Sequence, residues 1–151
     1  MKITLFTSNQ YRHKYLINLL ADHCDQLYVV QETRTIFPGL INGHYPVSKS
    51  MQNYFLNVKK AEETLFGKSY INLESKNFKL ITLQTGEINN LRLKDFKDFL
   101  RSDMYLVFGS SYIKGNLIDH LIKNFSINIH MGVSPYYRGT DCNFWALYDN
   151  N

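Results

Sequence analysis

The stretch Met104-Tyr-Leu-Val-Phe108 is almost entirely apolar and leads directly into a glycine, Gly109. A strand that is apolar at every position, instead of at every second one, is typical of a parallel sheet covered on both faces. The stretch therefore predicts a central strand whose two sides are both buried.

Strand-like and helix-like segments alternate on either side of this stretch. Short apolar runs predict strands at residues 2–6, 25–30, 79–83 and 126–130. Apolar residues at helical spacing predict helices at residues 11–21, 51–66, 93–100 and 116–123, and another from about residue 143. This alternation predicts a single α/β domain over residues 1–151, an open, mostly parallel, Rossmann-like sheet with helices on both faces.

The first two helices are each expected to bury an apolar face. In the first helix this face consists of Tyr15, Leu16, Leu19 and Leu20. In the second it consists of Tyr54, Phe55, Val58, Ala61 and Leu65. Glycines and prolines predict an irregular segment at residues 31–49, where Ser48 is a candidate cap for the second helix.

The charge balance is basic: 17 Lys and Arg face 13 Asp and Glu, which gives a net charge of +4. This surplus fits an anionic substrate or a nucleic acid. The basic residues are dispersed along the chain instead of being gathered in one arm, so a nucleic-acid partner is disfavoured. We expect a phosphate-bearing small molecule as the partner.

Membrane, disulfide and metal features are not expected. No run approaches the ~18 consecutive apolar residues of a membrane helix. Cys24 and Cys142 lack the spacing of a disulfide framework or a metal site, and cytoplasmic localisation follows as the default expectation. Residues 144–151 stop in an apolar, helix-like segment without a closing cap, which favours the front part of a longer domain.

Ligands of open α/β sheets bind beyond the carboxyl ends of the strands. This rule selects the loops at residues 7–13, 84–89, 109–113 and 128–139. In the last loop, Asn128 and His130 lie two apart on a predicted strand, so both side chains share a face. An amide can stabilise an oxyanion and an imidazole can donate a proton. From this pair alone, a structural role in the loop is the favoured alternative.

The residues that follow favour a catalytic role for Asn128 and His130 over a structural one. The string Asn128-Ile-His-Met-Gly-Val-Ser-Pro-Tyr-Tyr-Arg-Gly139 resembles the signature loop of the folate-dependent formyltransferases. That family includes methionyl-tRNA formyltransferase, glycinamide ribonucleotide transformylase and the sugar-nucleotide N-formyltransferases. Ser134-Pro135 stands where the better-known members read Leu-Pro, a variant that favours the sugar-modifying branch.

The resemblance implies a mechanism without a metal, in which 10-formyltetrahydrofolate is the co-substrate. Asn128 would polarise the formyl group and stabilise the tetrahedral intermediate, and His130 would donate a proton or stabilise the oxyanion. The family's third catalytic residue, an Asp, would follow beyond Asn151. Cys142 has no evident activating base, so we interpret it as a packing residue.

The resemblance also implies binding residues. The segment after the central strand is similar to the family's segment whose backbone contacts the pterin of the folate, which here means Phe108, Gly109, Ser110, Ser111, Tyr112 and Ile113. The turn Gly86-Glu-Ile-Asn89 is similar to a turn in less-characterised members. Related transformylases hold the substrate phosphate after the first strand.

By the same resemblance the substrate would contact two loops, through Ser8, Asn9, Arg12, His13, Ser134, Tyr137, Arg138 and Gly139. At the first loop, the alternative is ordinary helix capping with a solvated Arg12. At the second, Tyr136 and Tyr137 could stack on a base or a sugar, or could simply be packing residues.

The sequence thus predicts formyl transfer to a substrate amine, most simply the amino group of a nucleotide-linked amino sugar. Methionyl-tRNA and glycinamide ribonucleotide are the alternative substrates within the family. A truncated or degenerate relative that only binds folate or nucleotide is the alternative from a different class.

Overall fold

The computed structural model describes residues 1–33, 49–72, 74, 77–139 and 142–150. Within these residues the strands form one five-stranded sheet in the order β3-β2-β1-β4-β5, and every neighbouring pair is parallel. The strands are β1 (Lys2–Thr7), β2 (Gln26–Thr33), β3 (Phe78–Gln84), β4 (Met104–Phe108) and β5 (Ser126–Asn128). The predicted open, parallel α/β sheet is therefore confirmed.

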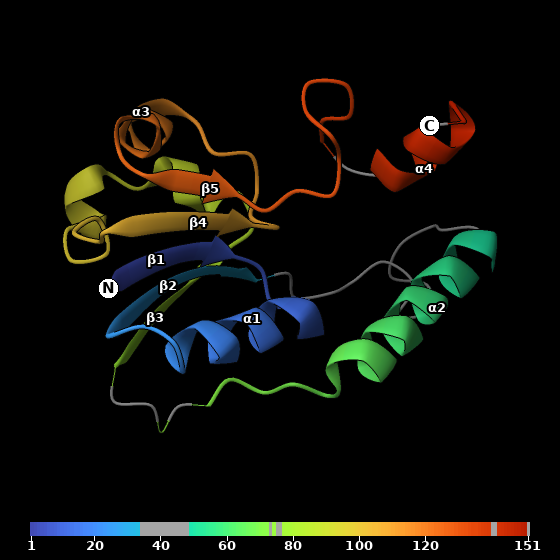
Figure 1. Ribbon diagram of the computed structural model, residues 1–151, viewed down its shortest axis with the longest axis horizontal. Helices are drawn as coiled ribbons and strands as arrows, with labels where there is room; N and C mark the ends of the chain where they lie inside the picture. The colour runs from blue at the N-terminus through green and yellow to red at the C-terminus, as the bar shows by residue number, and fades with distance from the viewer. Residues whose placement is uncertain (34–48, 73, 75–76, 140–141, 151) are drawn as a thin grey trace.

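Helices cover both faces of this sheet (Figure 1). One face carries α1 (Tyr11–Ala21), with α2 (Lys49–Phe66) packed beside it. The other face carries α3 (Gly115–Lys123) and two short 3₁₀ helices, η1 (Glu87–Asn90) and η2 (Leu93–Phe96). Beyond the carboxyl end of β5, the chain continues into α4 (Cys142–Tyr148), which Figure 1 shows set apart from the sheet.

The sheet has a separate hydrophobic core on each face. Successive side chains of a strand point to opposite faces, so each strand contributes to both cores. The core beneath α1 contains Ile3, Leu5, Ile17, Leu27, Val29 and Leu106. The opposite core contains Phe6, Val30, Ile88, Phe96, Tyr105, Ile113, Leu117 and Leu121. Neighbouring β4 residues thus lie in different cores, as predicted for a central strand buried on both sides.

Several predicted boundaries differ from the structure. β2 extends to Thr33, inside the segment predicted to be irregular, because it keeps pairing with β3 as far as Gln84. The predicted helix at 93–100 forms only the single 3₁₀ turn of η2, and the predicted strand at 126–130 ends at Asn128. Residues 34–48, including Ser48, lie outside the described residues.

The predicted apolar faces of α1 and α2 are confirmed only in part: Leu16 and Leu20 of α1 pack against the core, whereas other predicted residues are exposed. α1 buries His13 and Ile17, while Tyr15 and Leu19 are 47% and 44% exposed. On α2, the predicted apolar residue Leu65 is 74% exposed. A polar contact between the helices explains this difference, since buried Glu62 of α2 forms an ion pair with Arg12 of α1.

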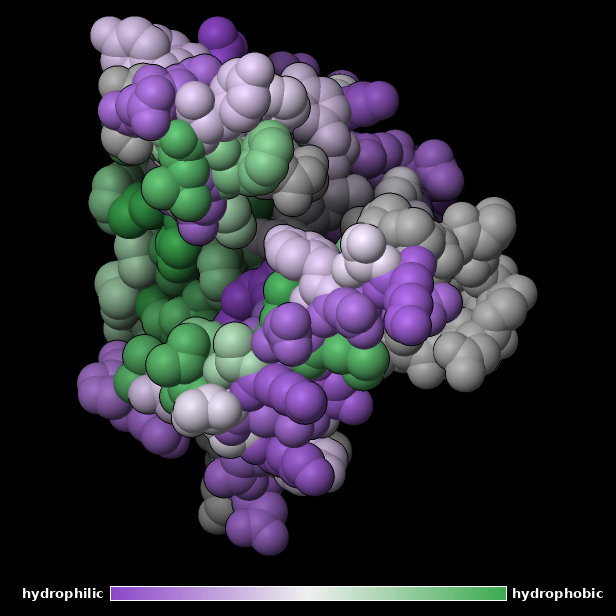
Figure 2. Space-filling model, turned by 90° about the vertical axis from the view of Figure 1, so that its right-hand side faces the viewer, coloured by the Kyte–Doolittle hydropathy of each residue, from purple (hydrophilic) through white to green (hydrophobic). Residues whose placement is uncertain are grey.

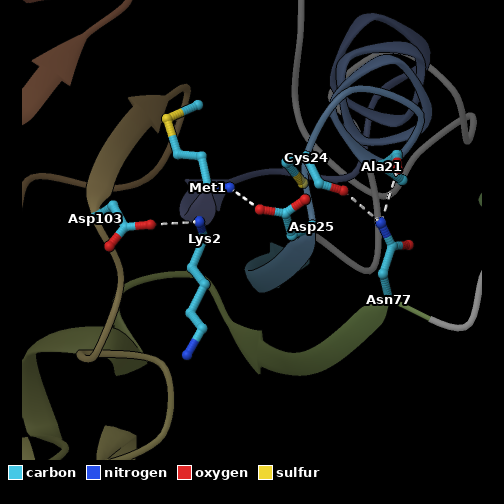
Figure 3. A network of polar contacts seen from close by, with 7 residues as sticks. All are labelled: Met1, Lys2, Ala21, Cys24, Asp25, Asn77 and Asp103. Carbon is cyan, nitrogen blue, oxygen red and sulfur yellow. Dashed lines mark hydrogen bonds and ion pairs between the residues drawn. The ribbon is translucent and has the colours of Figure 1, made fainter.

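Structural contacts close the amino edge of the sheet (Figure 3). The ammonium group of Met1 pairs with Asp25, and the Lys2 N–H donates to the carboxylate of Asp103 at 2.7 Å. The side-chain amide of Asn77 donates to two carbonyls at and after the end of α1, at 2.9 and 2.7 Å. The starts of β1 to β4 are thereby tied together.

The surface at the carboxyl-terminal part of the molecule carries exposed apolar side chains. Figure 2 shows hydrophobic side chains gathered in a band along one side of the face that lies to the right in Figure 1. The exposed hydrophobic residues of the carboxyl-terminal part include Ile127 and Ile129 at β5 and Trp145 and Leu147 in α4. β5 is therefore much less covered than β1 and β2.

Candidate functional site

The candidate ligand crevice lies between β1 and β4, where the direction of the strand order reverses. From β1 the chain proceeds outward to β2 and β3, and it then crosses to β4 and β5 on the other side. Loops that leave neighbouring strands in opposite directions open a ligand crevice at such a point. At this point the last residues of β1 and β4 are joined, since the Thr7 hydroxyl donates to the Phe108 carbonyl at 2.8 Å.

His13 lies at the base of this crevice and is 1% exposed. Its ring meets that of Phe108 edge-on, with the ring centroids 4.7 Å apart. A Cβ at Gly109 would lie 2.3 Å from His13 Nε2, and Gly109 has a φ of +71°, which favours glycine. The predicted substrate and folate loops therefore touch each other through His13, Phe108 and Gly109.

The His13 ring is held in its neutral form. Nδ1 accepts a hydrogen bond from the Gln10 N–H at 3.3 Å, which places the ring proton on Nε2. Nε2 is buried and has no hydrogen-bond partner within the described residues. Burial, followed by the charge of Arg12, lowers the His13 pKa from 6.5 to about 3. His13 thus lies beneath the first loop as a neutral group and supplies no positive charge for a phosphate.

The other residues predicted for the first loop are placed differently. Ser8 is buried, and its carbonyl accepts a hydrogen bond from the Gln31 amide at 3.2 Å, whereas Asn9 is half-buried. Arg12 lies in the first turn of α1 with its guanidinium on Glu62. A phosphate at this turn would therefore share Arg12 with a carboxylate.

The loop after β4 is fastened by Glu32, a residue that the sequence analysis missed. Glu32 is the penultimate residue of β2, pairs in register with Leu83 of β3, and is 1% exposed. One carboxylate oxygen accepts hydrogen bonds from the Gly86 N–H at 2.7 Å and the Ser111 hydroxyl at 2.9 Å. The other accepts one from the Ser111 N–H at 2.5 Å. The sequence offered no local signal for this role, because the donors come from loops that follow two other strands.

A second fastening comes from Asn89, in the turn that the sequence analysis singled out. Its amide donates to the Tyr112 carbonyl at 2.9 Å and accepts from the Lys114 N–H at 2.8 Å. The Tyr112 side chain is 81% exposed, while Ile113 is buried in the core. The hydroxyl of Ser110 donates to the Ser111 carbonyl at 3.1 Å. The whole segment is thus ordered by contacts from η1 and β2.

Asn128 and His130 lie at the end of β5. Asn128 is exposed and pairs in register with Val107 of β4, and the Ile129 N–H still donates to the Val107 carbonyl at 2.8 Å. The ladder then stops. His130 Nδ1 accepts a hydrogen bond from the Gly132 N–H at 3.0 Å, so that Nε2 carries the proton and donates to the Gly139 carbonyl at 2.9 Å. His130 is therefore oriented by its own loop, and not by the strand pleat on which the prediction rested.

The loop after His130 is folded on itself. The Tyr137 hydroxyl donates to Asp149 at 3.1 Å, and Arg138 Nε donates to the Pro135 carbonyl at 3.1 Å. Ser134 is exposed, and Gly139 has a φ of +92°. Cys142 is buried, and its sulfur would be 2.7 Å from a Cβ at Gly132. An open cavity of about 240 Å³ is lined by Tyr136, Tyr137, Arg138, Cys142, Trp145 and Asp149.

The structure brings together some of the predicted site residues. The loops at 8–13 and 109–113 are in contact, and β5 places Asn128 on the strand next to β4. The hydrogen bonds described above for His130 and Arg138 are made within residues 130–139, and Tyr137 reaches Asp149 beyond α4. No helix among the described residues is long and apolar enough to cross a membrane.

Among solved structures, one match covers the whole chain. It is the crystal structure of a phosphoribosylglycinamide formyltransferase from Anaplasma phagocytophilum, with a TM-score of 0.55 and 11% sequence identity over 100% of this chain. The chain shares the α/β fold of that enzyme. It spans 59% of the length of that enzyme. No protein-family model and no curated protein matches the sequence.

Proposed function

We propose that the protein transfers a formyl group from 10-formyltetrahydrofolate to the amine of a phosphate-bearing substrate. The observation that carries this proposal is the coincidence of a formyltransferase fold with the Asn128-Ile-His130 loop at the end of β5, one strand away from the crevice. The fold alone would admit many chemistries, because related α/β sheets carry unrelated functions. The loop supplies the residue types that formyl transfer needs.

The reaction forms a bond between the substrate nitrogen and the formyl carbon and breaks the bond from that carbon to N10 of the folate. The amine loses a proton, and N10 gains one. The Asn128 amide, exposed at the strand end, would donate to the formyl oxygen as negative charge develops on it. His130 already carries its proton on Nε2, the correct tautomer for a donor. To act, this N–H must exchange the Gly139 carbonyl for the reacting group.

The folate would lie against the loop at 109–113. The crevice position and the exposed Gly109 backbone fit a flat ring that is recognised by peptide groups. The side chain of Ile113 is buried, so that residue would contribute only its backbone.

We propose a nucleotide-linked amino sugar as the amine substrate. Two features support this choice: the Ser134-Pro135 variant of the loop, and the cavity where Tyr136 and Tyr137 lie with Arg138. Aromatic rings and an arginine suit a base and a phosphate. The first turn of α1 would hold a second phosphate oxygen through its backbone N–H groups.

The test is a formyl-transfer assay with 10-formyltetrahydrofolate and a panel of amines: nucleotide-linked amino sugars, glycinamide ribonucleotide and methionyl-tRNA. Asn128→Ala and His130→Ala should each lower kcat by about a hundredfold or more. Asn124→Ala and His23→Ala, exposed residues shortly before β5 and β2 at the amino edge of the sheet, serve as matched controls.

Near-normal turnover in either site variant would refute the assignment of that residue. Folate binding without transfer to any amine would favour the binding-only alternative. Binding is followed by thermal unfolding, because a ligand at a hundred times its Kd stabilises the folded state by about 2.7 kcal/mol.

A further inference from the structure

Glu32 is a buried carboxylate that joins two loops and three strands. It stands near the end of β2, and its three hydrogen-bond donors come from Gly86, after β3, and from Ser111, after β4. A buried carboxylate is costly unless its oxygens are hydrogen-bonded. Here both oxygens accept, so the cost is offset only while the two loops keep their positions.

Ser111 is the centre of this arrangement, since both its backbone N–H and its hydroxyl donate to Glu32. On one side of Ser111, the His13 ring supports Gly109 from below. On the other side, Asn89 holds the next carbonyl and the Lys114 N–H. The segment is thus fixed at its start, middle and end by residues from three other parts of the chain. A loop ordered before its ligand arrives loses less conformational entropy on binding.

We propose that Glu32 is a positioning residue for the folate: it holds the segment 109–113 in the conformation that receives the pterin, without touching the folate itself. This inference rests on the proposed function. It assigns a role to a residue outside the signature loop, and it predicts that folate affinity depends on a carboxylate at the end of β2.

The variant Glu32→Gln tests the charge and the acceptor count while keeping the shape of the side chain. In either orientation of the new amide, its NH₂ group faces a backbone N–H, of Gly86 or of Ser111. The segment should therefore lose its fixed conformation. Ser111→Ala is the milder second variant, which removes only the hydroxyl contact. Glu87→Gln is the matched control, since the exposed Glu87 carboxylate also accepts a backbone N–H, from Gln84 at 2.9 Å.

The measurements are the Kd of 5-formyltetrahydrofolate, a stable reduced folate, by calorimetry, and amide hydrogen exchange at Gly86 and Ser111. Glu32→Gln should raise the Kd at least about tenfold, and Ser111→Ala by about threefold, with Glu87→Gln unchanged. Exchange at the two amides should accelerate in Glu32→Gln, while amides in β1 and β4 stay protected. The KM for the amine substrate should not change, and neither should kcat at saturating folate.

The possible failures can be told apart. If the wild-type protein binds no reduced folate, both the proposed function and this inference fall. If the wild type binds and a folded Glu32→Gln variant binds within about twofold of it, only the positioning role is refuted. If Glu32→Gln does not fold, Ser111→Ala decides: an unchanged Kd overturns the inference. An equal loss of folate and amine-substrate affinity would also overturn it, because that result indicates general destabilisation.

Discussion

The buried, neutral His13 should make the stability of the protein sensitive to mild acid. Its pKa is about 3 in the folded protein, lowered first by burial and then by the charge of Arg12, against 6.5 for a free side chain. At about pH 7.5 the ring is neutral in both states. Below pH 6.5 the His13 ring binds a proton in the unfolded chain but stays neutral in the folded protein, so stability is lost as the pH falls towards 3.

The magnitude follows from the two pKa values. The slope approaches about 1.4 kcal/mol per pH unit, so the His13 contribution to stability should fall by about 2 kcal/mol between about pH 7.5 and pH 5. A protein of this size is stable by roughly 5–15 kcal/mol, so the loss is large enough to measure.

The assay compares urea unfolding of the wild type and His13→Asn at both pH values, followed by far-UV circular dichroism. Asparagine does not titrate, and its carbonyl can take the Gln10 N–H that Nδ1 now accepts. The variant will be less stable at neutral pH because it leaves a cavity. The decisive quantity is the difference in free energy of unfolding between the wild type and His13→Asn, which should be smaller by about 2 kcal/mol at about pH 5 than at about pH 7.5. A difference that stays constant would refute a neutral, buried His13.

Three further substitutions test the crevice and the framework. Arg12→Ala should raise the substrate KM with little change in kcat, and it should also lower the stability of the protein. Glu62→Gln, which removes the partner of Arg12, should lower stability only. An increase in KM in both variants would contradict phosphate binding by Arg12. Gly109→Ala should lower the free energy of unfolding in urea by about 2–3 kcal/mol, because its methyl group would overlap the buried His13 ring. Gly86→Ala is the control and should cost about 1 kcal/mol, since Gly86 has a similar positive φ but open space around it. Equal costs would refute the contact between Gly109 and His13. Asn77→Ala should lower stability by about 1–2 kcal/mol in thermal unfolding, because the carbonyls of Ala21 and Cys24 would lose their hydrogen-bond donor. An unchanged Tm would show that water replaces both contacts.

The sequence was sufficient to predict the sheet because its central strands, β1, β2 and β4, contribute buried residues to both cores. The apolar run of β4 and the bounds of α1 were predicted at the residues that the structure shows. Predictions failed where a polar contact replaces an apolar one. α2 contacts α1 through buried Glu62, and α1 buries His13, so hydrophobic spacing identified only part of the buried face of α1, namely Leu16 and Leu20.

The positions of the candidate site loops could be predicted, whereas their contacts could not. Loops at the carboxyl edge follow from the strand order, so their residues could be named in advance. Glu32 could not, because its role depends on which loops β2 meets across the sheet, and no local pattern records that. The orientation of His130 depends on backbone groups of Gly132 and Gly139, which sequence spacing does not reveal.

The pairing of β1 with β4 has a consequence for how the protein folds. Thr7 and Phe108, which share a hydrogen bond at the crevice, are separated by 101 residues. Contacts this distant in sequence form slowly, because a long loop must close before they stabilise anything. β1, β2 and β3 all come before β4 in the chain, within residues 2–84, so we expect them to assemble while one side of β1 stays unpaired. The crevice therefore comes into existence only at the last step, when β4 docks on that open edge, and ligand binding should be the last property to recover in a refolding experiment.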